Sequence, residues 1–154
     1  MSMFNPADFL NTEVSDANST KRELCPAGQH LAVIDKIEAR PWTKKDDPTK
    51  SGVTLEVTWS IQNQEVLTAL DQDKVVVRQG VMLDFNDAGG LDTGKGKNIG
   101  LGRLREALGL NVPGVPFVFN QLVGRMANVV VQHEVDRNDP EKVYDRVQMV
   151  APAV

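Results

Sequence analysis

Strict alternation of apolar and polar residues between positions 53 and 61 constrains the fold more than any other feature of the chain. The apolar set is Val53, Leu55, Val57, Trp59 and Ile61, and the polar set is Thr54, Glu56, Thr58 and Ser60. Because successive side chains of a β-strand point to opposite faces, this pattern predicts a strand with one dry face and one wet face. Trp59 shares the apolar phase, so we expect its indole in the core.

Four further segments have strand-like sequences. Residues 74–85 repeat the alternation, with Val75, Val77 and Val81 in one phase and Arg78 in the other. The other three segments are rich in β-branched residues and are bounded by turn residues. They span residues 29–39, 125–135 and 142–150.

One short helix is expected between the third and fourth strands. Leu101, Leu104 and Leu108 fall at the three- and four-residue spacing of a helix face. Asn98 suits the N-cap of this helix and Gly109 suits its C-terminal stop. The segment therefore predicts an amphipathic helix of about two to three turns.

This order of elements predicts the fold class. Three strands, a helix and two strands is the order of the OB-fold, a partly open Greek-key barrel. In that fold the second and third strands, with the first-second and fourth-fifth loops, form the usual ligand surface. We expect a mostly β protein with a five-stranded, OB-fold-like Greek-key barrel, although other small barrels share this order.

Composition favours one folded domain preceded by an arm. The chain has 154 residues, of which 41% are hydrophobic and 25% charged, which suffices for a core that stands alone. Residues 1–23 are polar, carry four acids against two cations, and include an apolar cluster at Phe4, Phe9 and Leu10. We predict a flexible acidic arm at residues 1–23, loosely ordered or docked through its two rings, and an OB-like β-barrel domain at residues 24–154.

Charge and cysteine content narrow the function classes. A net charge of -4 argues against coating duplex DNA by bulk charge, so any nucleic-acid site must be a local patch. Cys25 is the only cysteine, which excludes an intrachain disulfide and favours a reducing compartment. No apolar run approaches the roughly 20 residues of a membrane span, so we expect a cytoplasmic protein without membrane contact. His30 and His133 lack metal-ligand spacing, and we predict no metal, no cofactor and no enzymatic activity.

A Trp lies among cations between the first two expected strands, in a segment that we expect to be a loop. The residues concerned are Arg40, Trp42, Lys44, Lys45 and Lys50. An exposed indole can stack on a base while cationic groups hold phosphates, which is how many proteins bind single strands. We expect these residues to bind nucleic acid. The alternative is that Trp42 folds back and caps the end of the barrel.

Six further cations complete the predicted nucleic-acid surface. They are Lys74 and Arg78 on the outward phase of the third strand, Lys95, Lys97 and Arg103 near the helix, and Arg137 in the turn between the last two strands. In an OB-fold the turn of Arg137 and the loop of Trp42 lie at the mouth of the same cleft. Glu56, on the same wet face, is the one discordant charge.

The Gly-rich segment offers a nucleotide-binding alternative. Residues 89–95 match the spacing of a phosphate-binding P-loop as far as Lys95. Gly96 then stands where a Ser or Thr hydroxyl should bind magnesium, and no parallel α/β pattern follows. A flexible loop whose lysines meet phosphates is the interpretation that we favour over nucleotide hydrolysis.

Several short motifs resemble those of bacteriophage-encoded single-stranded DNA-binding proteins. They are Cys25-Pro26-Ala27-Gly28-Gln29-His30, the lysine-rich loop that ends in Lys50-Ser51-Gly52, the helix from Ile99 to Gly109, and Gly124-Arg125-Met126-Ala127-Asn128-Val129-Val130-Val131. The likeness covers residues 24–151 in layout.

This resemblance implies an OB-fold that binds single-stranded DNA with little sequence preference during phage DNA replication or recombination. It further implies a location in the host cytoplasm, replication or recombination proteins as partners, and no catalysis. Many such proteins end in an acidic tail that recruits those partners, whereas residues 149–154 contain no acid, so recruitment through such a tail is not expected here.

Two questions stay open at the level of the sequence. An exposed edge strand would allow self-pairing, so we expect a homodimer. The main rival to nucleic-acid binding is a small-barrel protein-interaction module, serving as an assembly component, an adaptor or a host-factor inhibitor. Net acidity and the low aromatic content of 5% favour this rival.

Overall fold

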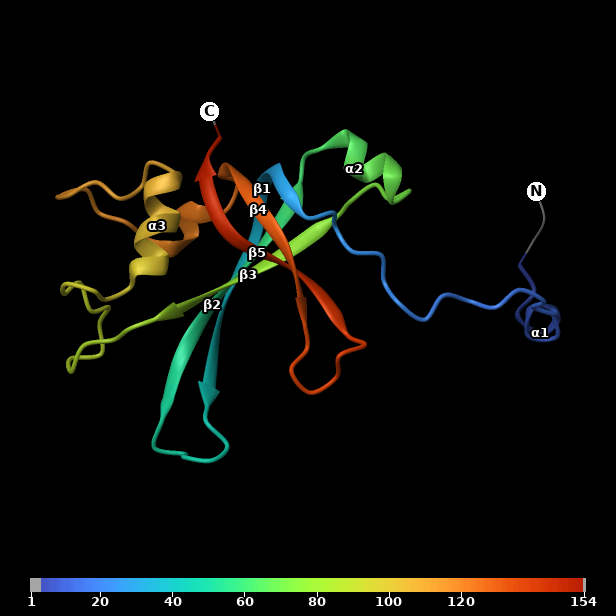
Figure 1. Ribbon diagram of the computed structural model, residues 1–154, viewed down its shortest axis with the longest axis horizontal. Helices are drawn as coiled ribbons and strands as arrows, with labels where there is room; N and C mark the ends of the chain where they lie inside the picture. The colour runs from blue at the N-terminus through green and yellow to red at the C-terminus, as the bar shows by residue number, and fades with distance from the viewer. Residues whose placement is uncertain (1–3, 154) are drawn as a thin grey trace.

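Five strands close into a ring in the computed structural model, which describes residues 4–153. The strands are β1 (Gly28–Thr43), β2 (Ser51–Ile61), β3 (Val76–Leu83), β4 (Met126–Val135) and β5 (Val143–Pro152). Their order is β1-β2-β3-β5-β4, and β4 pairs back with β1 (Figure 1). The expectation of a mostly β fold with five strands is confirmed.

β1 is a long strand that belongs to both halves of the ring. Residues 28–33 pair with β4, and residues 32–43 pair with β2. A register shift between Ile34 and Lys36 lies within the β2-paired region, just beyond the last residue that pairs with β4. Because a bulge bends a strand and increases its twist, this irregularity lets β1 turn from one neighbour to the other.

The pairing that closes the ring is shortest between β3 and β5. These strands are parallel and share a single pair, Arg78 opposite Arg146. All other neighbouring strands are antiparallel and pair over many residues. Past that pair, β3 and β5 each keep their hydrogen bonds to their other neighbour, and a groove opens between them.

The interior of the ring holds the apolar phase of every strand. Trp59 is fully buried, as the alternation in β2 predicts. Its indole Nε1 donates a hydrogen bond of 2.9 Å to Oε1 of Gln79, so the one polar atom of the indole has a partner. The other large residues at the centre are Ile34, Ile61, Leu104, Leu122, Val57, Val77, Val129 and Val131.

The expected helix is present as α3 (Ile99–Ala107), and it packs on β3 and β5. Leu101 and Leu104 are buried, and Gly109 ends the helix with a left-handed φ of 72°. Asn98 occupies the N-cap position, but its side chain does not cap the helix. Its amide bonds instead to the backbone of Asp84 and Asp92, and so ties the end of β3 to the loop before α3.

The expectation of a single helix is incomplete. A second helix, α2 (Gln64–Ala69), connects β2 to β3, and a 3₁₀ turn, η1 (Phe119–Leu122), precedes β4. α2 has six residues and buries only Val66, so it is too short to produce a helical period in the sequence. Asn63 caps α2 by accepting a hydrogen bond from the backbone N–H of Glu65.

The N-terminal segment leaves the ring as an extended arm that carries α1 (Pro6–Leu10) at its far end (Figure 1). Asn5 caps α1 through bonds to two backbone N–H groups. The arm returns to the ring at Arg22, which binds Asp145 of β5. The division into an arm at residues 1–23 and a domain at residues 24–154 stays a prediction, and residues 1–3 and 154 of it lie outside the described residues.

Candidate nucleic-acid interface

The wet face of β1, β2 and β3 forms one continuous surface. The register places Arg40 opposite Thr54 and Trp42 opposite Gly52. It places Glu56 of β2 opposite Gly80 of β3, and Thr58 opposite Arg78. Residues directly opposite each other on adjacent strands share a face, so these side chains lie on one side of the sheet. The expected wet face is exposed only in part, because Thr58 and Ser60 at the end of β2 are buried.

Trp42 lies within β1, and the expectation of a loop position is wrong. Its backbone pairs with Gly52, and β1 continues to Thr43. The indole lies over Gly52, since a Cβ added there would meet its ring carbon Cζ2 at 2.7 Å. One face of the ring therefore rests on the sheet, and the side chain remains 36% exposed. The strand extends this far because it pairs with β2 across the hairpin. Pro41 and the nearby cations hide this extension in the sequence.

The loop beyond Trp42 is short and carries lysines. Lys44, Lys45 and Lys50 are all exposed, and the backbone of Lys44 closes the loop by donating to the carbonyl of Lys50 at 2.9 Å. Within residues 4–153 none of these three ammonium groups forms a salt bridge. They are available to an anionic ligand.

Glu56 holds two of the predicted cations in the middle of the face. Its carboxylate lies 3.3 Å from Nε of Arg40 and 3.5 Å from Nε of Arg78. Arg40 also binds Glu38 at 2.9 Å, and hydrogen bonds from Arg40 and Lys36 hold the pKa of Glu38 below its usual value. Both guanidinium groups remain more than half exposed, so the acid orients them without consuming all their donors.

Tyr144 is a second aromatic at this face, and sequence reasoning missed it. It lies on β5, is 40% exposed, and its hydroxyl donates to Asp136 at 3.2 Å. That bond raises the pKa of Tyr144, while bonds led by the backbone N–H of Asn138 lower the pKa of Asp136. The sequence signal is weak, because the inward residue between Tyr144 and Arg146 is an acid, Asp145, which does not mark a dry phase.

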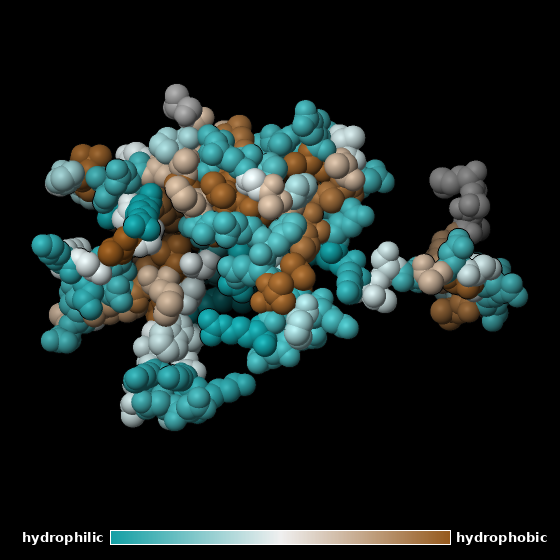
Figure 2. Space-filling view, in the orientation of Figure 1, coloured by the Kyte–Doolittle hydropathy of each residue, from teal (hydrophilic) through white to brown (hydrophobic). Residues whose placement is uncertain are grey.

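Tyr144 and its neighbours line a hollow of about 570 Å³. The residues around it are Arg22, Thr54, Glu56, Val76, Val77, Arg78, Gln79, Gly80, Tyr144, Asp145 and Arg146. Five of them are charged, and they come, with Tyr144, from segments far apart in the sequence: Arg22, Glu56, Arg78, Asp145 and Arg146. The β1–β2 and β4–β5 hairpins project to the same side of the ring beside it, and their tips are hydrophilic (Figures 1 and 2).

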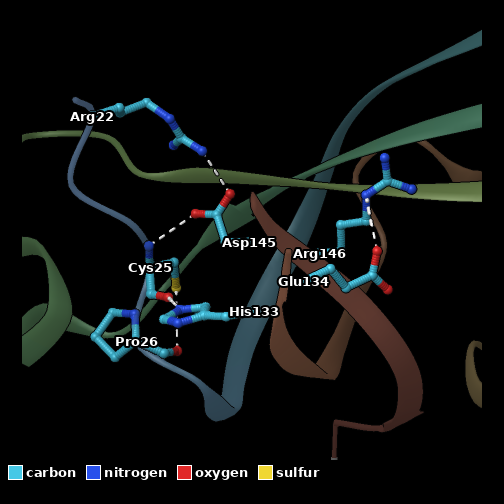
Figure 3. Close-up of polar contacts among 7 residues, drawn as sticks. All are labelled: Arg22, Cys25, Pro26, His133, Glu134, Asp145 and Arg146. Carbon is cyan, nitrogen blue, oxygen red and sulfur yellow. Dashed lines mark hydrogen bonds and ion pairs between the residues drawn. The ribbon is translucent and has the colours of Figure 1, made fainter. Parts of the chain in front are cut away.

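A buried carboxylate holds Arg22 in this hollow (Figure 3). Asp145 accepts from Nη2 of Arg22 at 2.6 Å and from the backbone N–H of Cys25 at 2.8 Å. Nε2 of His133 donates to the Cys25 carbonyl at 2.7 Å, and Nε2 of His30 donates to that of Pro26 at 2.8 Å. Both histidines therefore fix the backbone at residues 25–26.

Cys25 has no sign of reactivity. Its side chain is fully buried, and burial, with a smaller contribution from Asp145, raises the pKa of the thiol to about 11. The thiol is protonated at neutral pH and is a poor nucleophile. Among residues 4–153 there is no cluster of three His, Cys, Asp or Glu side chains that could hold a metal ion.

The remaining predicted cations do not all join this face. Lys74 lies outside β3 and binds Asp35 at the β1 bulge, 2.7 Å away. Arg137 is in the turn of the β4–β5 hairpin, as expected. Lys95 and Lys97 lie in the loop before α3, and Arg103 lines the groove between α3, β3 and β5. The structure therefore separates the predicted site into a hairpin-side group and an α3-side group.

Comparison with known proteins adds no relative. No protein-family model matches this chain, and a search of curated proteins finds no significant match. Within the described residues, no helix combines the length and the apolar character that crossing a bilayer requires.

Proposed function

We propose that the protein binds single-stranded DNA on the outer face of β1, β2 and β3. Trp42 and Tyr144 stack on bases, and the cations between and beside them contact phosphates. The observation that carries this proposal is that two half-exposed aromatics, from two different hairpins, border one surface that is rich in Arg and Lys. Stacking platforms beside a cationic track are the common chemistry of single-strand binding.

We propose that this five-stranded ring is an OB-fold, and the strand order with α3 between β3 and β4 supports that proposal. In OB-folds the second and third strands and the two hairpin loops bind oligonucleotides, and here those elements carry Lys44, Arg78 and Arg137. Trp42 lies at the end of β1, beside the first of these loops. Binding to this surface serves DNA replication or recombination, and replication or recombination proteins are the partners that we propose.

The electrostatics favour single strands over duplex. With a net charge of -4 the protein repels nucleic acid except at its local patch. Several of the exposed cations of the hairpin side are already paired with acids. A ligand must therefore add base stacking to phosphate contacts, and only an unpaired strand exposes its bases for that.

The proposal is tested by fluorescence anisotropy with a labelled single strand of about 30 nucleotides. Trp42→Ala and Tyr144→Ala should each weaken binding by about 1–3 kcal/mol, whereas Trp42→Phe and Tyr144→Phe keep a ring and should retain most of the affinity. Duplex DNA of the same sequence should bind far more weakly, and RNA measures the preference between the two nucleic acids.

The rival function is a protein-interaction module, and the ion pairs favour it to the extent that they occupy Arg40, Arg78 and Arg146. Such a module should ignore oligonucleotides even at low ionic strength. Absence of single-strand binding at about 50 mM salt would therefore refute the proposed function in favour of this one.

A further inference from the structure

The arm carries an apolar cluster that no other described residue covers. Phe4, Phe9 and Leu10 are 71%, 59% and 80% exposed, and the two ring centroids lie 5.3 Å apart. α1 buries none of its five residues. So short a helix is not stable in water by itself, and its apolar face therefore requires a surface to pack on.

A groove of about 850 Å³ with a mixed polar and apolar lining lies on the side of the ring opposite the arm, between α3 and the diverging strands β3 and β5. Its apolar lining includes Val81, Met82, Ile99, Val147, Met149 and Val150. Three of these are strongly exposed: Met82, Ile99 and Met149, at 64%, 53% and 58%. Exposed apolar side chains gathered around a groove are typical of an interaction site.

We propose that α1 of one copy docks into the groove of a second copy, with the reciprocal contact closing a dimer. The arm leaves the ring on the side away from α3, so it points to a neighbour rather than to its own groove (Figure 1). Residues 11–21 tether α1 to the anchored Arg22 and span up to about 36–40 Å when extended. Hydrophobic surface is visible both on the arm and along the α3 side of the molecule (Figure 2).

The contact area suits a stable dimer. Two Phe side chains bury about 300–500 Å² when they are fully covered. An equal area on the groove and a second, reciprocal arm raise the total to about 1,200–2,000 Å², which is the size of a standard specific interface. The two rings already cover part of each other, so the arm reaches this range only when the exposed Leu10 and Val14 join the contact.

Cations lie beside the groove rather than within it. The arm carries Asp8, Glu13 and Asp16. The lining has one cation, Arg103, against Asp84 and Glu106, so its own charge does not attract an acidic arm. Gly96 of the lining lies between Lys95 and Lys97, and these two lysines are the charges that can meet the acids of the arm at the rim of the groove.

The first test measures the molar mass of the full chain by light scattering at about 1–100 μM. The wild type should be a dimer, and both the double variant Phe9→Ser/Leu10→Ser and the groove variant Ile99→Asp should be monomers. An acid at the first position of α3 favours the helix, so Ile99→Asp should keep its circular dichroism and melting temperature. Val115→Ser, a change of an exposed Val outside the groove, is the matched control and should stay dimeric.

The second test asks whether the arm and the groove of different copies touch. A Leu10→Cys chain mixed with a Met149→Cys chain should form a disulfide-linked heterodimer under mild oxidation, and Leu10→Cys mixed with Val115→Cys should not. The native Cys25 is buried and should not form a disulfide under these conditions. A monomeric wild type, a dimer that survives both sets of point variants, or equal cross-linking to both partners would overturn the proposal. None of these measurements contains DNA, so they test the dimer independently of the proposed function.

Discussion

Asp145 joins β5 to the end of the arm through one buried side chain. It lies on β5, binds the guanidinium of Arg22 and accepts the backbone N–H of Cys25. The Asp145 carboxylate is almost completely buried, whereas Arg22 is more than half exposed. The ion pair is screened on the Arg side, so its main role is to satisfy a carboxylate that water cannot reach.

Arg22→Ala should lower the free energy of unfolding by about 1–3 kcal/mol, because Asp145 would keep only the Cys25 N–H as a partner. Urea denaturation monitored by Trp fluorescence measures the change. Lys21→Ala removes the neighbouring exposed cation and should stay within about 0.5 kcal/mol of the wild type. Equal stabilities of the two variants would show that the pair contributes nothing.

At the scale of elements, the β1–β2 hairpin positions the proposed stacking residue. Trp42 lies flat over Gly52 because glycine has no side chain to lift the indole away from the sheet. The backbone of Gly52 has no left-handed conformation, so a larger residue is strained only by contact with the ring. The hairpin therefore controls the height of the Trp42 indole above the sheet.

Gly52→Ala should displace the Trp42 ring and weaken single-strand binding toward the level of Trp42→Ala, without loss of the fold. Gly80→Ala on the same face is the matched control, since its Cβ would make an ordinary contact of 3.6 Å with Thr54. Anisotropy gives the affinities, and the change in Trp42 emission is measured against the buried Trp59. Unchanged binding in Gly52→Ala would mean that the observed ring position is not the binding one.

Elements differ in how well the sequence predicts them. Alternation over many residues predicted β2 and the inward phase of β3, because a half-buried strand imposes a period of two on its own residues. Helix α2 and the last residues of β1, beyond residue 39, were not predicted. α2 is too short for a period, and the end of β1 is a strand because it pairs with β2, which is a nonlocal contact.

At the scale of the whole molecule, a net acidic protein carries exposed cations, interleaved with Glu38 and Glu56, on the outer face of β1, β2 and β3. The lysines of the β1–β2 loop extend that face beyond the ring, and those near α3 lie on the other side of β3. The affinity for single strands should therefore depend on salt through a small number of phosphate contacts.

Replacing Lys44, Lys45 and Lys50 together by Ala should make the dependence of log K on log salt concentration shallower by about 2, since each phosphate contact to a single strand contributes about 0.7. Lys74→Ala is the control, because Lys74 is bound to Asp35 and should leave the slope unchanged. Titrations at several salt concentrations give the slopes. An unchanged slope in the triple variant would place the DNA path elsewhere.

The sequence by itself determined the strands, their inward residues, the helix before β4 and the kinds of side chain available for binding. These follow from local periodicity and composition, which each segment carries alone. Only the tertiary structure decided which cations share a face, which of them Glu56 engages, and that Tyr144 and Arg22 belong beside Arg78. The reason is that register and ring closure are pairings between distant segments, and a shift of one residue would turn every one of these side chains to the other face.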